Sequence, residues 1–198
     1  GHDIVGSNDL YESMLIFIEP TTTPRPEARV VQRLDGIWFK PDQFHTHNKL
    51  IKQAYDNSDH VIWQSEFDKK MTTKWWGDRK GSIIHNGIDF KTVYPNSDFL
   101  NWRKNYERVF VCSASWHRQK RLKENIDFFQ KNSTNKDALL VLGKNPDCYI
   151  KSQNIFYLGN ITHENCLEVY SKCDWMIHLA WLDHCPNVVV EALSQGCP

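Results

Sequence analysis

The sequence predicts an α/β protein in which two successive units each carry a parallel sheet covered by helices. Short runs of β-branched and apolar residues alternate with stretches whose apolar residues recur at helical spacing. The alternation is interrupted by a polar stretch, residues 96–107, which we interpret as a linker, and then starts again. Because strands that alternate with helices form parallel sheets, we expect one unit over residues 1–97 and a second over residues 98–198.

In the first unit, the run ARVVQRL has the β-branched composition of a strand. Residues 47–57 place four apolar side chains on one helix face, and Ser65 is a favourable N-cap for the helix that follows it. Asn86-Gly87 is a turn signal. The expected strands are residues 28–34, 60–64 and 81–85, and the expected helices are residues 47–57 and 66–76.

In the second unit, strands such as RVFVCSA and DWMIHL again alternate with helical patterns. Pro186 suits the first turn of the last helix, and Gly196 suits its C-terminal end. The expected strands are residues 108–114, 138–143, 154–158 and 174–179, and the expected helices are residues 120–131, 163–172 and 186–195.

Composition and charge exclude several classes of protein. The chain has 24 Lys and Arg residues against 24 Asp and Glu residues, so no strong field is available to hold a polyanion, and we expect no nucleic-acid partner. The longest apolar stretches, residues 14–18 and 138–142, are far shorter than the about 20 residues of a membrane span. No secretory leader is visible at the start of the chain.

The six cysteines show no Cys-x-x-Cys pair and no regular framework. We therefore expect reduced thiols and a cytoplasmic location. His45 and His47 form the one close histidine pair, without a cysteine or acid at ligand spacing, so we expect no metal site.

Residues 182–198, LDHCPNVVVEALSQGCP, carry the strongest functional signal. Asp183 lies in the loop after an expected strand, and the following helix begins near Pro186. Its free backbone N–H groups and positive dipole end would lie at the carboxyl edge of a parallel sheet, where anionic ligands bind. Glu191, one turn into this helix, could accept hydrogen bonds from two ribose hydroxyls. Taken alone, it is also typical of an acid that complements the helix dipole.

This stretch resembles the donor-binding signature of retaining glycosyltransferases with the GT-B fold, the glycogen-synthase-like group 1 family (family 4 type). The family pattern is an acidic residue, seven others, and then Glu-Ala-(Met/Leu)-x-x-Gly-x-Pro. Here Asp183 is followed after seven residues by EALSQGCP. The first acid is Asp where the family more commonly has Glu, and Cys185-Pro186 replaces the usual Phe-Gly.

Two further segments resemble the family in the same order along the chain. Residues 86–89 with Tyr94-Pro95 look like the turn that closes the family's first domain. Residues 115–121, SWHRQKR, follow the first strand of the second unit, where the family carries an Arg and a Lys that hold the donor diphosphate. Lys120 matches the Lys, and Arg118 or Arg121 would take the place of the Arg. Without the resemblance, these basic residues are also typical of a solvated helix start.

The resemblance implies a GT-B-like fold of two Rossmann-like units, both incomplete in this chain. Residues 1–97 would be the C-terminal part of the acceptor-side domain, and residues 98–198 the N-terminal part of the donor domain. The implied catalytic residues are Lys120, Arg118 and Glu191. The implied donor-binding residues are Asp183, Cys185, Pro186, Asn187, Val188, Glu191, Gly159, Ser115 and Arg121. Arg33, Asp35 and Asn86 would lie on the acceptor side of the cleft, although Asp35-Gly36 and Gly159 are also typical of simple turns.

The function that this resemblance implies is transfer of a hexose from a nucleotide-diphosphate sugar to a glycan, lipid or other hydroxyl acceptor, with retention of anomeric configuration and without a metal ion or cofactor. The alternatives are a non-catalytic or inactive nucleotide-sugar-binding fragment, and a GT-B-fold epimerase or phosphorylase. Peripheral membrane association through segments outside this chain stays open.

Overall fold

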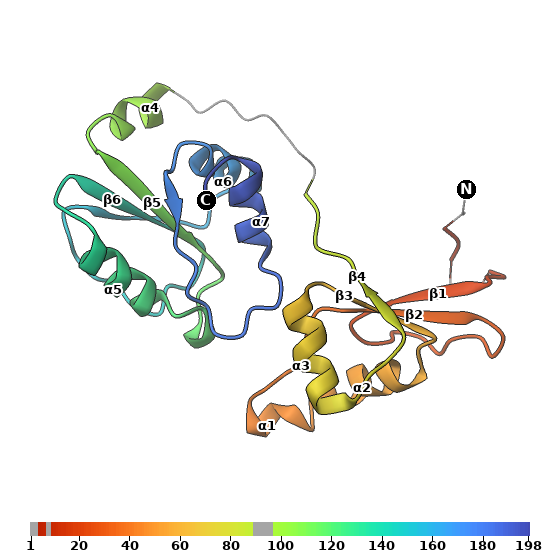
Figure 1. The fold of residues 1–198 in the computed structure, drawn as a ribbon. Helices are drawn as coiled ribbons and strands as arrows, with labels where there is room; N and C mark the ends of the chain where they lie inside the picture. Colours follow the sequence, from red (N-terminus) through yellow and green to blue (C-terminus); the bar gives the residue numbers. More distant parts are fainter. Residues whose placement is uncertain (1–3, 7–8, 89–96) are drawn as a thin grey trace. The chain divides into compact units, whose positions relative to one another are not determined.

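The structure is a computed structural model that describes residues 4–6, 9–88 and 97–198. The chain forms two compact units, Gly1–Asn86 (unit 1) and Gly87–Pro198 (unit 2), and each contains a four-stranded sheet (Figure 1). Unit 2 includes Ile88, which packs against the core of that unit. The expected turn at Asp89 and Tyr94-Pro95 lies outside the described residues.

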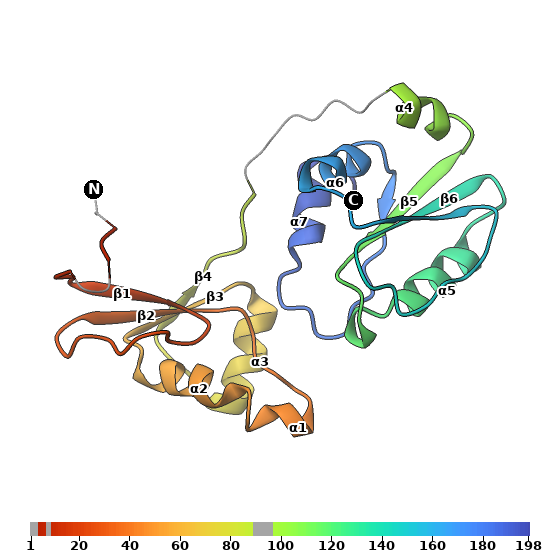
Figure 2. The same cartoon turned by 180° about the vertical axis from the view of Figure 1, so that it is seen from behind.

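Unit 1 holds a sheet with the strand order β1-β2-β3-β4, in which every strand is parallel to its neighbours. Its elements are β1 (Ser13–Phe17), β2 (Arg29–Leu34), α1 (Pro41–Phe44), α2 (Asn48–Asn57), β3 (His60–Trp63), α3 (Glu66–Trp76) and β4 (Gly81–Ile83). Alternate residues of β2 and β3 are buried, and among them Leu34, Val61 and Trp63 pack with Ile51 and Tyr55 of α2. Helices α2 and α3 cover the same face of this sheet (Figures 1 and 2).

Unit 2 holds a second all-parallel sheet with the strand order β7-β6-β5-β8. Its elements are α4 (Ser97–Arg103), β5 (Arg108–Ser113), the short 3₁₀ helix η1 (Arg118–Lys120), α5 (Leu122–Asn132), β6 (Asp137–Leu142), β7 (Ile155–Gly159), α6 (His163–Tyr170), β8 (Trp175–Met176) and α7 (Asn187–Ser194).

The second sheet is buried on both faces. Val109 and Val111 of β5 belong to a core cluster with residues of α6 and α7, whereas Phe110 and Cys112 belong to the cluster that contains α5. Helix α5 accordingly lies on one face of the sheet, with α6 and α7 on the other (Figure 1). All six residues of β6 are buried. A parallel strand covered on both faces is apolar along its whole length, which explains the continuous apolar run in the sequence.

Several sequence expectations need correction. Part of the expected linker is the helix α4, because Phe99 and Trp102 supply apolar area to the core of unit 2 and the Trp102 ring lies 5.2 Å from that of Phe156. Strand β8 is only two residues long, so His178 lies beyond the strand rather than within it. Strand β1 and helix α1 were not expected. The other expected strands and helices are present, with ends shifted by one or two residues.

No helix in the described part of the chain combines the length and apolar character needed to cross a membrane.

The carboxyl edge of the second sheet depends on a glycine. Gly143, directly after β6, has φ 109°, and a Cβ placed on it would lie 1.7 Å from the carbonyl oxygen of Ala114. Its N–H donates to the carbonyl of Gly159 over 2.7 Å. The segments that follow β5, β6 and β7 therefore approach one another at a point where only glycine fits.

We predict that Gly143→Ala destabilises unit 2 severely, because a backbone clash adds to a left-handed φ that alone costs about 1–3 kcal/mol. Gly159→Ala is the matched control. Gly159 has φ 68° but open space around its Cβ position, so only the conformational cost of about 1–2 kcal/mol applies. Urea unfolding of both variants measures the difference, and equal losses of stability would contradict the close approach at Gly143.

Candidate functional site

The residues expected to bind a donor lie at the carboxyl edge of the second sheet or just beyond it. Because all four strands are parallel, the segments that leave their carboxyl ends emerge at one edge. Ser115, Arg118, Lys120 and Arg121 follow β5, Gly159 ends β7, and Asp183, Cys185 and Pro186 connect β8 to α7, which contains Asn187, Val188 and Glu191. All of them belong to unit 2.

At this edge, the carboxylate of Asp183 contacts two other side chains. Lys120 Nζ donates to Asp183 Oδ2, and His178 Nε2 lies 3.1 Å from the same oxygen. All three side chains are largely buried, with exposed fractions of 27% for Lys120, 19% for Asp183 and 16% for His178. This arrangement joins the segment after β5 to the segment after β8 through a partly buried ion pair.

Two opposing effects set the pKa of Asp183. Burial raises it, but the hydrogen bonds from His178 and Lys120 and the charge of Lys120 outweigh the burial and lower the pKa to about 2. Asp183 is therefore a carboxylate at neutral pH and can only accept hydrogen bonds. It follows that Nε2 of His178 carries the proton in their hydrogen bond.

A buried asparagine fixes the backbone around this ion pair. Asn125 of α5 is 1% exposed; its amide donates to the carbonyls of Lys120 and Arg121, and its Oδ1 accepts from the N–H of Leu179. The N–H of Trp181 also donates to the carbonyl of Gln119 over 2.7 Å. The backbones that carry Lys120 and His178 are thus held together without any contribution from Asp183.

The two arginines beside Lys120 lie differently. Arg118, at the start of η1, is exposed. Arg121 has the left-handed φ of 56° and pairs with Glu124 of its own helix over 3.3 Å. Arg118 is therefore the better placed of the two to supply a second positive charge for an anionic ligand, since the Arg121 guanidinium is already engaged with Glu124.

Helix α7 contributes its N-terminus and one acid. Its N-cap residue is Pro186, whose side chain makes no capping hydrogen bond. Glu191 is 19% exposed, and its Oε1 lies 3.3 Å from Nε2 of His163, the first residue of α6. Both the helix end and the carboxylate can engage a polar ligand, the former through N–H groups and the latter as an acceptor.

The three residues expected on the acceptor side meet in unit 1. Arg33 donates to Asp35 over 2.6 Å and to Asn86 over 2.5 Å, and Asn86 in turn donates to Gln64 over 3.0 Å. The N–H of Gln64 donates to Asp68, a fully buried acid whose pKa burial raises to about 7. This network lies at the carboxyl end of β2 and β3.

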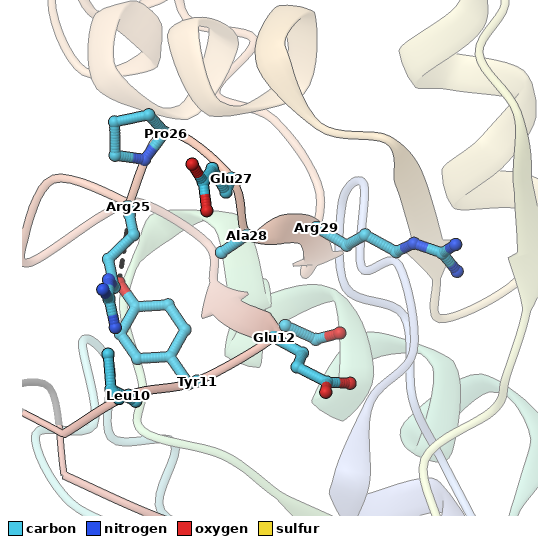
Figure 3. A pocket seen from close by; sticks show the side chains of 9 residues that line it. Leu10, Tyr11, Glu12, Arg25, Pro26, Glu27, Ala28 and Arg29 are labelled. Atoms are coloured by element: carbon cyan, nitrogen blue, oxygen red, sulfur yellow. Dashed lines mark hydrogen bonds between the residues drawn. The ribbon is translucent and has the colours of Figure 1, made fainter.

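The pocket drawn in Figure 3 lies at the opposite edge of this sheet. It has a volume of about 870 Å³ and is lined by residues 10–13 and 25–29, which lead into the amino ends of β1 and β2. The main-chain N–H of Arg25 donates to the Tyr11 hydroxyl at its rim over 3.1 Å. None of the residues expected to carry function lines this pocket.

Among residues 4–6, 9–88 and 97–198, no group of three or more His, Cys, Asp or Glu side chains could hold a metal ion.

Sequence reasoning did not identify His178, Asn125, His163 or Asp68 as functional. The sequence gives a weak indication of His178, because it is a polar residue at the end of an otherwise apolar strand pattern. Asn125 interrupts the apolar face of α5, and Asp68 is the third residue of a helix whose N-cap, Ser65, accepts from its N–H. Their roles depend on partners that are distant in the sequence.

The chain is similar in structure to several large α/β proteins. Sucrose-phosphate synthase from Thermosynechococcus elongatus matches with a TM-score of 0.70 and 16% identity over 87% of this chain and 49% of that chain. HepE from Anabaena, solved in complex with UDP-glucose, matches with a TM-score of 0.68 and 18% identity over 86% of this chain and 52% of that chain. A trehalose-6-phosphate protein from E. coli bound with UDP-2-fluoro glucose matches with a TM-score of 0.65 and 10% identity, over 85% and 50% of the two chains.

These similarities confirm the expected fold class, an incomplete GT-B-like α/β fold in which each of two units contains a parallel sheet. The chain spans about half the length of the solved structures that it matches. No protein-family model and no curated protein sequence matches it.

We predict that Asp183 makes unit 2 sensitive to acid. Its pKa of about 2 lies below the ordinary value of about 3.9, so its contribution, on the order of 2 kcal/mol, is complete above about pH 5 and is lost as the pH falls through 4 toward 2. Asp183→Asn should therefore flatten the stability profile between pH 4 and 2, measured by hydrogen exchange of amides in β5 and β6. Asp127→Asn, at an exposed ion pair on α5, is the control and should keep the wild-type slope. An unchanged slope in Asp183→Asn would contradict the assignment.

Proposed function

We propose that the chain is part of a retaining glycosyltransferase and that its unit 2 binds a nucleotide-diphosphate sugar. The observation that carries the proposal is the partly buried Lys120–Asp183 pair, placed at the carboxyl edge of a parallel sheet in the same unit as the N-terminus of α7. The similarity in fold to HepE and the E. coli protein, solved with UDP-glucose and UDP-2-fluoro glucose, supports the choice of ligand class.

Lys120 and Arg118 are the groups that we propose for the diphosphate. Lys120 is 27% exposed and held at the sheet edge, whereas the exposed Arg118 can fold over a bound anion. Backbone N–H groups at Asn187 and Val188, together with the helix dipole, add partial positive charge. These groups stabilise the negative charge that develops on the departing diphosphate, so the proposed transfer needs no metal ion or cofactor.

Glu191 and Asp183 are the proposed ligands of the sugar hydroxyls. Glu191 can accept two hydrogen bonds from the ribose, in exchange for its present contact with the exposed ring of His163. Asp183, with a pKa of about 2, stays ionised and cannot act as the general acid that two-carboxylate glycoside hydrolysis requires. Its carboxylate suits hydrogen bonds from the donor hexose, with the backbone at Cys185 and Pro186 and the turn at Gly159 lining the site.

We propose that unit 1 contributes to binding of the acceptor substrate. Arg33, Asp35 and Asn86 form a polar cluster at the carboxyl end of its strands. A pocket of about 330 Å³ lies near the carboxyl end of β1, and Trp38 presents a 42% exposed ring to it. An indole face beside polar groups suits a hydroxyl-bearing acceptor such as a glycan.

We predict that one of UDP, GDP or ADP, or its sugar conjugate, stabilises this chain in a thermal-shift assay. At about 100-fold above Kd, binding adds about 2.7 kcal/mol of stability, which raises the melting temperature measurably. Lys120→Ala and Glu191→Ala should abolish the shift, because each removes a charge or acceptor that contacts the ligand. EDTA should leave it unchanged.

Lys123→Ala on α5 and Glu164→Ala on α6 are the matched controls. Lys123 is exposed and pairs with Asp127 rather than with Asp183, and Glu164 is exposed in the first turn of α6. Both should keep the wild-type shift. A cooperatively melting chain with no shift for any nucleotide would contradict the proposed function. A shift without sugar transfer to any glycan acceptor would favour a non-catalytic binding protein.

A further inference from the structure

The Asp183 carboxylate has two partners, and only one of them has a proposed role in ligand binding. Lys120 and His178 both contact Oδ2, from the segments after β5 and β8 respectively. If Lys120 binds the diphosphate, as proposed above, its ammonium group must turn at least in part from Asp183 to the ligand. If Lys120 were its only partner, the largely buried carboxylate would then be left unpaired at a cost in free energy, and it would also lie near the negative charge of the ligand.

Backbone hydrogen bonds on both sides of His178 fix its position, whereas the side chain of Lys120 is more flexible. On one side of His178, the N–H of Ile177 donates to the carbonyl of Val111 over 2.8 Å; on the other, the N–H of Leu179 donates to Oδ1 of Asn125 over 3.1 Å. The imidazole is 16% exposed. The Lys120 ammonium, by contrast, sits at the end of a flexible four-carbon stem that can reorient.

We propose that His178 is a positioning residue that holds the Asp183 carboxylate independently of Lys120 and thereby frees Lys120 to bind the diphosphate. The part concerning Lys120 rests on the proposed function; the part concerning Asp183 does not. A proton on Nε2 of His178 is sufficient for this role, because it donates one hydrogen bond to Oδ2.

The first experiment follows the side-chain carboxyl carbon of Asp183 by NMR through an acid titration of the full 198-residue chain. In Lys120→Met we expect the pKa of Asp183 to stay below the ordinary value of about 3.9, because the His178 hydrogen bond remains. In Lys120→Met combined with His178→Leu, burial acts alone and the pKa should rise above that value. In the same background, His178→Gln should restore the low pKa, since its amide also donates. Equal pKa values in Lys120→Met and in the combination with His178→Leu would overturn the proposal.

The second experiment measures the affinity for the nucleotide that stabilises the wild-type chain. His178→Leu should weaken binding by about tenfold, as expected for loss of a hydrogen bond to a charged group, and His178→Gln should restore it. In the Asp183→Asn background, His178→Leu should have no further effect, because His178 acts through Asp183. A loss of the same size in that background would show that His178 acts by packing and would overturn the proposal. If no nucleotide binds the wild type, the proposed function fails, and the titration still decides whether His178 holds Asp183.

Discussion

The burial of β5 and β6 on both faces is the constraint on which the rest of unit 2 depends. Helix α5 covers one face and α6 and α7 cover the other, so the middle of each strand carries apolar side chains that pack in the core, and polar residues such as Arg108, Ser113 and Asp137 are confined to the strand ends. Polar groups can gather only where the strands end. The close approach at Gly143 then draws the segments after β5, β6 and β7 together. The same burial that stabilises the sheet therefore places the candidate site at its carboxyl edge.

At that edge, polar groups are held in pairs that a ligand can replace. The buried side chain of Asn125 ties the backbones at Lys120 and Leu179 together by hydrogen bonds, which fixes the backbone beneath the site. The side chains above it are arranged differently: Lys120 is paired with Asp183, and Glu191 with His163. A positively charged group and an acceptor are thus kept in place without a ligand. Rigid backbone beneath exchangeable side-chain pairs is the arrangement expected of a preorganised binding site.

The sequence predicted most of the elements because their signals are local. Ser65 accepts a hydrogen bond from the N–H of Asp68 as an N-cap should, and Gly196, just after the C-cap of helix α7, has φ 78°. The prediction of a linker before β5 was wrong, because helix α4 is stabilised by Phe99 and Trp102, which pack against residues far along the chain, rather than by its own sequence pattern. Strand β8 is shorter than its apolar run because it pairs with only two residues of β5.

The sequence by itself determined the α/β class, the parallel sheets and the segments that carry Lys120, Asp183 and Glu191, since strand and helix periods and helix-end residues act over a few positions. Only the tertiary structure decided which side chains meet. Lys120 and Asp183 are 63 residues apart, and Arg33 and Asn86 are 53 apart. Such contacts are set by the packing of helices on a sheet, and so are the burial that raises the pKa of Asp68 and the hydrogen bonds that lower the pKa of Asp183. Neither follows from the order of residues along the chain.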